Sequence, residues 1–463
     1  QPSTYAAQRL SRASARPTVI FLPDMRPSAR PFIGQSRPPC QLALLPIGLL
    51  LKKTIYPTTL FLVLFLFQSA HLNLEWGFFG HRLINRMAVF TLPPGMMIFY
   101  KKNIEYVSDH AVDPDKRRYA TKHEAVRHYI DLDIWGEYPF ENFPRTQIGA
   151  LMKYTDVFVI DKQNDTTLVL GNELRIDEDK FFIKFRYLEN KEVVIPKKKF
   201  QSFFYNNILA KYYDDVWELD LDSFQLYFDE FFPTSNGYKV IAEDKFSEYG
   251  VLPFHLMRMQ NKLTKAFENK DAKSILRISA DYGHYIGDAH VPLHTTENYN
   301  GQLTNQIGIH AFWESRIPEL FAEEEYDFFV GKAEYVENKV DYFWDIILTS
   351  HQLVDSVLLI EADMVKAFPE DKQFCFDNRN DLTVRTQCRA FAEAYSDRMQ
   401  GMVEERMTSS VYSLGSLWYT AWVDAGQPDL TDLGNEELTE REKKELEELN
   451  NSVRSGDIKG REH

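Results

Sequence analysis

Cysteine is scarce in this sequence: its 463 residues include only Cys40, Cys375 and Cys388. No cysteine or serine stands in an arrangement that suggests a catalytic nucleophile, which argues against covalent catalysis through a side chain. If Cys40 belongs to a leader that is removed, the other two cysteines, thirteen residues apart, predict a disulfide. Two unpaired structural cysteines are the alternative.

Positive charge is also in short supply. The chain has 53 lysines and arginines against 68 aspartates and glutamates, a formal net charge of -15. This balance argues against a surface that binds duplex DNA by neutralising its phosphates. Because the residues before Trp76 are on balance basic, the rest of the chain is more acidic still. An anionic substrate would need a local source of positive charge, which bound metal cations can supply.

The N-terminal region lacks an apolar run long enough to span a bilayer comfortably. Its run at residues 60–67, LFLVLFLF, follows Lys52 and Lys53 and ends in small residues, a pattern typical of a secretory signal. We therefore expect residues 1–75 to be a leader, with the signal at about 52–70, that is removed from an exported protein of the periplasm or the extracellular space. A retained membrane anchor is the alternative.

The sequence does contain a long helical pattern. Hydrophobic residues make up 44% of the chain, which is ample for a sizeable core. Helical periodicity predicts a mainly α domain over residues 76–431, and short β-rich runs predict an insertion of one or two hairpins at about 150–240. Residues 432–463 are charged and poor in apolar residues, so we expect a frayed helix or a disordered tail there.

The central stretch, residues 275–314, carries two histidine–acid pairs with a further histidine between them. These residues are His284 with Asp288, then His294, then His310 with Glu314. A spacing of four residues puts both members of a pair on one helical face. Nitrogen and oxygen donors at this density are ligands that divalent metals such as zinc prefer. Either pair alone could be a solvated helix pair, but two pairs so close together in apolar surroundings predict a metal site.

A second stretch rich in acids and histidines lies at residues 109–133. Its main members are Asp113, His128, Asp131 and the basic triplet Lys116, Arg117 and Arg118. Acids and imidazoles beside basic residues suit a site that holds metals together with a phosphate. A solvated charged loop is the alternative.

Together these motifs resemble the superfamily of trinuclear zinc phosphodiesterases. Its two branches are the extracellular single-strand nucleases of the S-one/P-one type and the bacterial zinc-dependent phospholipases C. The resemblance rests on Trp76 with His81, on Asp113 fifteen residues before His128, on the signature HxIGDxxxPLH from His284 to His294, and on His310 with Glu314. It implies a multi-helix fold like that of phospholipase C and P-one nuclease, carrying the β-rich insertion.

The resemblance further implies three zinc ions. By analogy, one is bound by Asp113, His128, His284 and Asp288, a second by His294, His310 and Glu314, and a third by Trp76, His81 and the shared Asp288. In that family an N-terminal Trp binds through its own amine and carbonyl. Two ions are therefore expected if Trp76 is not the first residue of the mature chain.

The same resemblance assigns catalytic roles. Water activated by zinc, held partly by Asp113 and Asp288, is expected to attack phosphorus in line. Lys116 and Arg117 would stabilise charge on the phosphoryl oxygens. No side-chain nucleophile is needed for this reaction.

The sequence features that bear on the substrate match both branches. Tyr129 and Asp131 fall where the nucleases hold a base by stacking and by a hydrogen bond, whereas Glu314 and a short loop before His310 look like the phospholipase branch. Gly308 also stands where the nucleases use an asparagine near the phosphate.

The sequence thus favours a secreted zinc-dependent phosphodiester hydrolase acting on single-stranded nucleic acid, with phospholipid head groups as the alternative substrate. A zinc-stabilised binding protein without catalytic activity is the alternative of another class. We expect a monomer, without stable duplex DNA binding and without a transmembrane anchor after processing.

Overall fold

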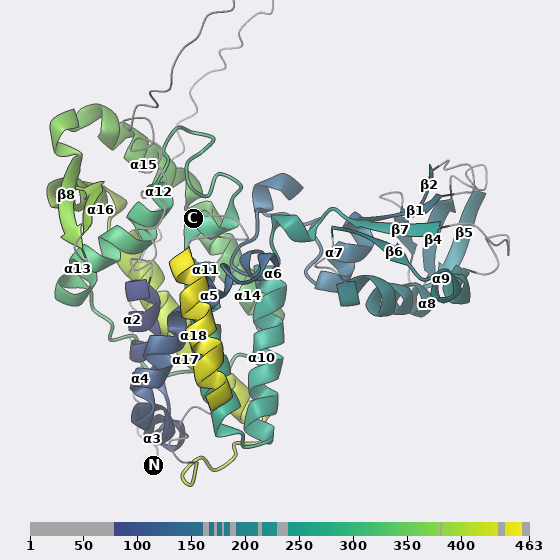
Figure 1. The fold of residues 1–463 in the computed structure, drawn as a ribbon, viewed down its shortest axis with the longest axis horizontal. Helices are drawn as coiled ribbons and strands as arrows, with labels where there is room; N and C mark the ends of the chain where they lie inside the picture. The colour runs from purple at the N-terminus through teal and green to yellow at the C-terminus, as the bar shows by residue number, and fades with distance from the viewer. Residues whose placement is uncertain are drawn as a thin grey trace, which may run out of the picture. The chain divides into compact units, whose positions relative to one another are not determined.

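The computed structural model of the chain is mainly helical, as predicted (Figure 1). It describes residues 78–160, 166–170, 174–177, 180–185, 191–211, 215–228, 239–379, 382–433 and 440–455. Trp76 and the predicted signal sequence lie outside the described residues.

The α-helices span most of the described chain. They are α2 (Phe78–Ala88), α3 (Pro94–Lys102), α4 (Ile104–Asp109), α5 (Asp113–Arg117), α6 (Lys122–Ala125), α7 (Gln147–Tyr154), α8 (Lys197–Phe203), α9 (Leu221–Phe228), α10 (Leu252–Glu268), α11 (Ala272–His290), α12 (Ile309–Ala311), α13 (Ile317–Glu325), α14 (Lys339–Gln352), α15 (Val354–Ala367), α16 (Arg389–Met399), α17 (Met402–Asp424) and α18 (Glu440–Ser455). The 3₁₀ turns are η2 (Val89–Thr91), η3 (His110–Val112), η4 (Leu132–Trp135), η7 (Leu209–Lys211), η8 (Ser247–Tyr249), η9 (Pro292–Thr295) and η11 (Glu370–Lys372). Two π-helical turns are η6 (Phe204–Ile208) and η10 (Phe312–Arg316).

Helix α11 lies at the centre of the helical core and contacts α2, α10, α14 and α17. Asp271 caps its first turn, because its side chain accepts a hydrogen bond of 3.1 Å from the backbone N–H of Ser274. Pro292 follows two residues after its end and prevents it from continuing. Every residue from Tyr282 to His290 is buried. The histidine and acid of this segment therefore lie inside the protein rather than on a solvated face.

Two glycines let α2 approach α11 closely. A Cβ at Gly283 would lie 1.7 Å from Asn85 Oδ1, and one at Gly287 would lie 2.7 Å from His81 Nδ1. Asn85 also donates a 3.0 Å hydrogen bond to the carbonyl of Ala280. Because the helices meet at this short distance, His81 of α2 reaches the acid-bearing end of α11.

The strands of two antiparallel sheets fall in the range predicted for the β-rich insertion. They are β1 (Thr155–Ile160), β2 (Thr166–Leu170), β3 (Leu174–Asp177), β4 (Lys180–Phe185), β5 (Lys191–Pro196), β6 (Val216–Leu219) and β7 (Lys239–Asp244). Their orders are β2-β1-β7-β6 and β3-β4-β5. The first and last strands pair with each other from Thr155 opposite Asp244 onward, and Lys245 N–H donates to the carbonyl of Tyr154 at 3.2 Å. The chain therefore leaves and rejoins the helices at one place.

A two-stranded hairpin, β8 (Phe374–Arg379) and β9 (Leu382–Gln387), precedes α16. Cys375 and Cys388 form a disulfide across its base, with their Cα atoms 4.9 Å apart. The predicted disulfide is therefore confirmed, and the alternative of two free cysteines is wrong.

The stretch Lys339–Ala367 is long and apolar enough, by length and composition, to cross a membrane. In the structure it is two helices, α14 and α15, that meet at Leu353, and buried residues such as Ile347 and Val357 lie in the core. Core helices of this kind pass the same test, so the stretch carries no weight as a membrane span.

Candidate metal centre

Eight histidine and acidic side chains from distant parts of the chain converge on one site. They form four groups, in each of which the ligand atoms lie within 4.8 Å of one another: His81–Asp115–His284, His128–His284–Asp288, His294–His310–Glu314 and His81–Asp288–Glu314. Seven of these eight residues were expected from the sequence; Asp115 was not. The sequence predicted that Asp288 is shared between ions and that Glu314 is the last ligand of the site. The carboxylates of these two residues each belong to two groups.

The Asp288 carboxylate lies among four imidazoles. Its Oδ2 atom is 3.0 Å from His128 Nδ1 and 3.4 Å from His284 Nε2. Its Oδ1 atom is 3.5 Å from His81 Nε2 and 3.8 Å from His294 Nε2. The two oxygens therefore face different histidines, which puts Asp288 between separate groups of potential ligands.

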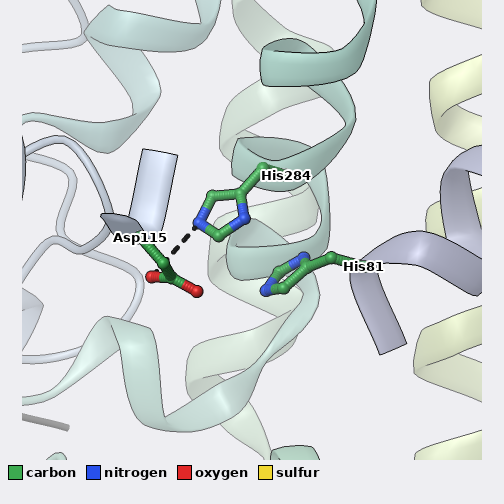
Figure 2. Close-up of side chains that lie close together, drawn as sticks. All are labelled: His81, Asp115 and His284. Carbon is green, nitrogen blue, oxygen red and sulfur yellow. Dashed lines mark ion pairs between the residues drawn. The ribbon is translucent and has the colours of Figure 1, made fainter. Parts of the chain in front are cut away.

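A hydrogen bond to the backbone orients the ring of His284. Its Nδ1–H donates to the carbonyl of Ala111 at 2.9 Å, which leaves Nε2 as the atom that faces the cluster. Figure 2 shows this ring between Asp115, whose Oδ1 is 3.6 Å from Nε2, and His81, whose ring centroid is 4.0 Å away. A backbone partner on the far nitrogen is the usual arrangement for a histidine that ligates a metal.

Glu314 closes the other side of the cluster. Its Oε2 atom is 2.7 Å from His310 Nε2 and 3.4 Å from His294 Nε2, and its Oε1 atom is 3.4 Å from His81 Nε2. The other nitrogen of His310 donates to the carbonyl of Tyr299 at 3.1 Å. Glu314 lies on the π-helical turn η10 and not on the regular helix that the spacing of four suggests.

Burial favours the neutral form of three histidines of the cluster, His128, His284 and His294. Burial, followed by the charge of neighbouring imidazoles, lowers the pKa of His128 and of His284 well below its ordinary value. Burial also lowers the pKa of His294 to about 4. A neutral imidazole keeps the lone pair with which it binds a metal.

The acids of the cluster provide the charge that a cation would balance. Burial, and next the carboxylates of Glu314 and Asp115, raise the pKa of Asp288 well above its usual range. Burial alone would raise the pKa of Glu314 as well, but the surrounding histidines, His294 first, hold it well below its ordinary value. Three carboxylates and five imidazoles around one buried point are a nitrogen and oxygen donor set that could hold divalent metal ions.

Asp113, expected as a ligand, lies away from these groups. Its Oδ2 atom is 2.5 Å from His110 Nδ1, and its Oδ1 atom accepts a 2.9 Å hydrogen bond from Lys116. Asp115 faces the cluster instead, with Oδ1 at 3.8 Å from His128 Nδ1. The two aspartates begin the short helix α5, and residues two apart on a helix point to nearly opposite sides. Only one of them can therefore face the histidines. The spacing of the motif predicted Asp113, whereas in the structure it is Asp115.

This geometry gives a matched pair of variants. Asp115→Asn is expected to weaken the affinity for zinc by more than the roughly 10–100-fold typical of losing an outer partner, because it removes a carboxylate that faces two imidazoles. Asp113→Asn should weaken it less, since the ion pairs of Asp113 are with His110 and Lys116, which belong to none of the four groups. Titration of both metal-free variants with zinc checks this, and a larger effect of Asp113→Asn would restore the sequence-based assignment.

The basic triplet is also arranged differently from expectation. Lys116 pairs with Asp113 at 2.9 Å, and Arg117 pairs with Asp281 at 3.0 Å. Arg118, to which no role was assigned, lies 3.4 Å from Asp115 and is buried. Its place three residues after Asp115 is the sequence signal that could have identified it, since residues at this spacing are neighbours on a helix.

The two residues expected to hold a base are enclosed in the protein. Tyr129 is 5% exposed and Asp131 is 4% exposed. The Tyr129 hydroxyl donates to the carbonyl of Glu248 at 3.0 Å, and the backbone N–H of Asp131 donates to the carbonyl of Tyr249 at 2.8 Å. As the side chains lie in this structure, stacking on Tyr129 would require a rearrangement.

Three other histidines have structural surroundings. His290 donates from Nδ1 to the carbonyl of Ile286 at 2.7 Å. His351 donates from Nδ1 to the carbonyl of Thr295 at 3.0 Å. His255 packs edge-on against the ring of Tyr285.

Trp76, the remaining expected ligand, lies outside the described residues, so the site as described consists of side chains from Phe78 onward. Of its expected partners, His81 and Asp288 lie together, with Glu314 as a third member of their group. No protein-family model matches the chain, and no curated protein is significantly similar to it.

Proposed function

We propose that this protein is an exported, zinc-dependent phosphodiester hydrolase of the same general kind as the trinuclear zinc phosphodiesterases. The observation that carries the proposal is the convergence of five histidines and three acids on one point, with Asp288 and Glu314 each shared between groups. Shared carboxylates are what a cluster of closely spaced ions requires. The disulfide supports export, because such bonds persist in oxidising compartments.

The ligand residues fit zinc, which when bound lowers the pKa of a water from 15.7 toward about 7 and polarises a phosphoryl oxygen. The chain itself contributes geometry and charge. Asp288 and Glu314 hold the imidazoles around one point, and the carbonyls of Ala111 and Tyr299 fix the rings of His284 and His310. These contacts hold the site in place before substrate arrives, so little reorganisation is needed during the reaction.

Arg118 supplies a fixed positive charge at the edge of the cluster. Its guanidinium is 3.4 Å from Asp115, and the residue is 7% exposed. We assign to it the stabilisation of negative charge on a phosphoryl group, the role expected for Lys116 and Arg117 from the sequence. Those two cations are paired with Asp113 and Asp281, which do not belong to the cluster.

From the sequence, single-stranded nucleic acid is the first choice of substrate and phospholipid is the second. The enclosed position of Tyr129, with its hydroxyl bonded to Glu248, is the structural observation that favours the second. A glutamate at position 314, which resembles the phospholipase branch, points the same way.

The proposal is tested with zinc-loaded protein. We expect hydrolysis of bis-p-nitrophenyl phosphate, a generic phosphodiester, and then of either single-stranded DNA and RNA or phosphatidylcholine. Release of nucleotides identifies a nuclease, and release of a phosphorylated head group identifies a phospholipase C. Bound zinc without turnover of any of these substrates would overturn the proposal and leave a zinc-stabilised binding protein.

A further inference from the structure

Glu314 lies on an irregular helical turn. Residues Phe312–Arg316 form a π-helical turn between α12 and α13, and such a turn is less stable than the regular helix on either side of it. Without support, this segment would tend to relax and rotate the Glu314 carboxylate away from His294 and His310. The described structure supplies that support at both ends of the turn.

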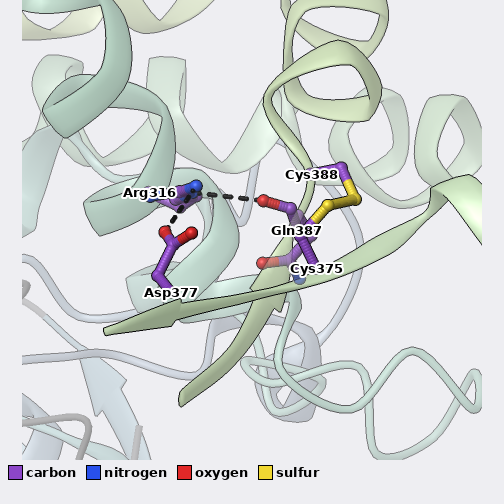
Figure 3. Close-up of a disulfide and its surroundings, with 5 residues drawn as sticks. All are labelled: Arg316, Cys375, Asp377, Gln387 and Cys388. Atoms are coloured by element: carbon purple, nitrogen blue, oxygen red, sulfur yellow. Dashed lines mark hydrogen bonds and ion pairs between the residues drawn. A yellow bond between two sulfur atoms is a disulfide. The ribbon is translucent and has the colours of Figure 1, made fainter. Parts of the chain in front are cut away.

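Arg316, the last residue of the turn, contacts the disulfide hairpin. Its guanidinium is 3.0 Å from the carboxylate of Asp377 on β8, and its Nε–H donates to the carbonyl of Gln387 on β9 at 3.3 Å (Figure 3). Arg316 is 6% exposed. A buried guanidinium that reaches both strands holds the turn in one position relative to the hairpin.

Phe312 ties the first residue of the turn to α16. Its ring stacks on Phe391 with centroids 5.7 Å apart and on Tyr395 at 5.0 Å. Helix α16 begins directly after Cys388, the half-cystine that closes the hairpin. The disulfide therefore links the hairpin to the start of α16. The hairpin contacts the last residue of the turn, and α16 contacts the first.

We infer that the disulfide-closed hairpin β8–β9 positions the metal ligand Glu314 through Arg316. Arg316 is a positioning residue in this arrangement, because it holds the backbone that carries a ligand. The two groups that contain Glu314 depend on the hairpin, whereas His128–His284–Asp288 and His81–Asp115–His284 do not. The inference rests on the metal centre alone, so failure of hydrolysis would leave it untouched.

Zinc affinity of the intact protein tests the inference. In Arg316→Ala and in the double variant Cys375→Ser/Cys388→Ser, zinc in the Glu314 groups is expected to bind about 10–100-fold more weakly. Zinc held by the two groups without Glu314 should keep its affinity. Equilibrium dialysis against buffered zinc separates the two classes of ion, and the visible spectrum of Co²⁺-loaded protein reports the ligand geometry directly.

The three substitutions should also be non-additive. If the hairpin acts through Arg316, the cysteine substitutions add nothing to the zinc affinity already lost in Arg316→Ala, because residues in one network do not contribute independently. Independent, additive losses would overturn the inference. So would a lowered melting temperature with zinc affinity and the Co²⁺ spectrum unchanged, since that result would give the hairpin a role in stability only.

Arg389→Ala is the matched control. Arg389 begins α16 close to the disulfide, but its guanidinium is half exposed and pairs with Glu324 and Glu325. Its removal should leave zinc affinity unchanged, and an equal loss would contradict the route through Arg316. If Arg316→Ala does not fold, Asp377→Asn removes the ion pair from its more exposed side and is expected to show the same selective loss, whereas unchanged affinity there would overturn the inference.

Discussion

His284→Ala is expected to abolish hydrolysis of bis-p-nitrophenyl phosphate and to remove metal from the cluster. The imidazole belongs to two of the four groups, with Nε2 at 3.4 Å from Asp288 and 3.6 Å from Asp115. Loss of a ligand itself should cost more than the roughly 10–100-fold that loss of an outer partner costs. Turnover and bound zinc, measured on the same purified sample, are expected to fall together.

His255→Ala is the control for that experiment. His255 is also buried, with 4% exposure, but it lies on α10 against Tyr285 and belongs to none of the groups. It should lower stability by leaving a cavity while zinc content and turnover remain. Equal losses of turnover in both variants would mean that activity reports folding and not the metal centre. Turnover retained in His284→Ala would exclude this cluster as the catalytic site.

The helical class and the histidine–acid pair on α11 could be predicted because they depend on local spacing. Asp288 follows His284 by one turn of a helix, and that relation holds wherever the helix packs. The disulfide could be predicted for a similar reason, since only two cysteines lie beyond the expected leader. Neither prediction required knowledge of the tertiary structure.

The choice between Asp113 and Asp115 could not be made in this way. Both stand at the start of α5, and which one faces the cluster depends on how that short helix is turned against His128 and His284. Hydrogen bonds from partners distant in sequence settle such a rotation, and the spacing of motifs carries no information about it.

The π-helical turn that carries Glu314 is a further limit of sequence reasoning. The spacing of His310 and Glu314 reads as an ordinary helical pair, yet the carboxylate is presented from an irregular turn. Its support comes from Arg316 and from a hairpin more than fifty residues later in the chain. A local pattern can thus identify the ligand without showing what holds it in place.

Asp288→Asn is expected to change stability in opposite directions with and without zinc. In the metal-free protein, the carboxylate is 1% exposed and lies near those of Glu314 and Asp115, which together with burial raise its pKa. Replacing it by a neutral amide of the same shape removes this repulsion, so the metal-free fold should become more stable. With zinc present, the same change removes a ligand from two groups and forfeits about 2.7 kcal/mol for each ion lost, at a free zinc concentration 100 times its Kd. Thermal unfolding of both proteins in chelator and in buffered zinc measures the two signs. If the carboxylate serves only packing, replacing it should destabilise the protein equally in both conditions. A stability difference between variant and parent that does not reverse with zinc would therefore show that the buried acid serves the fold and not a metal.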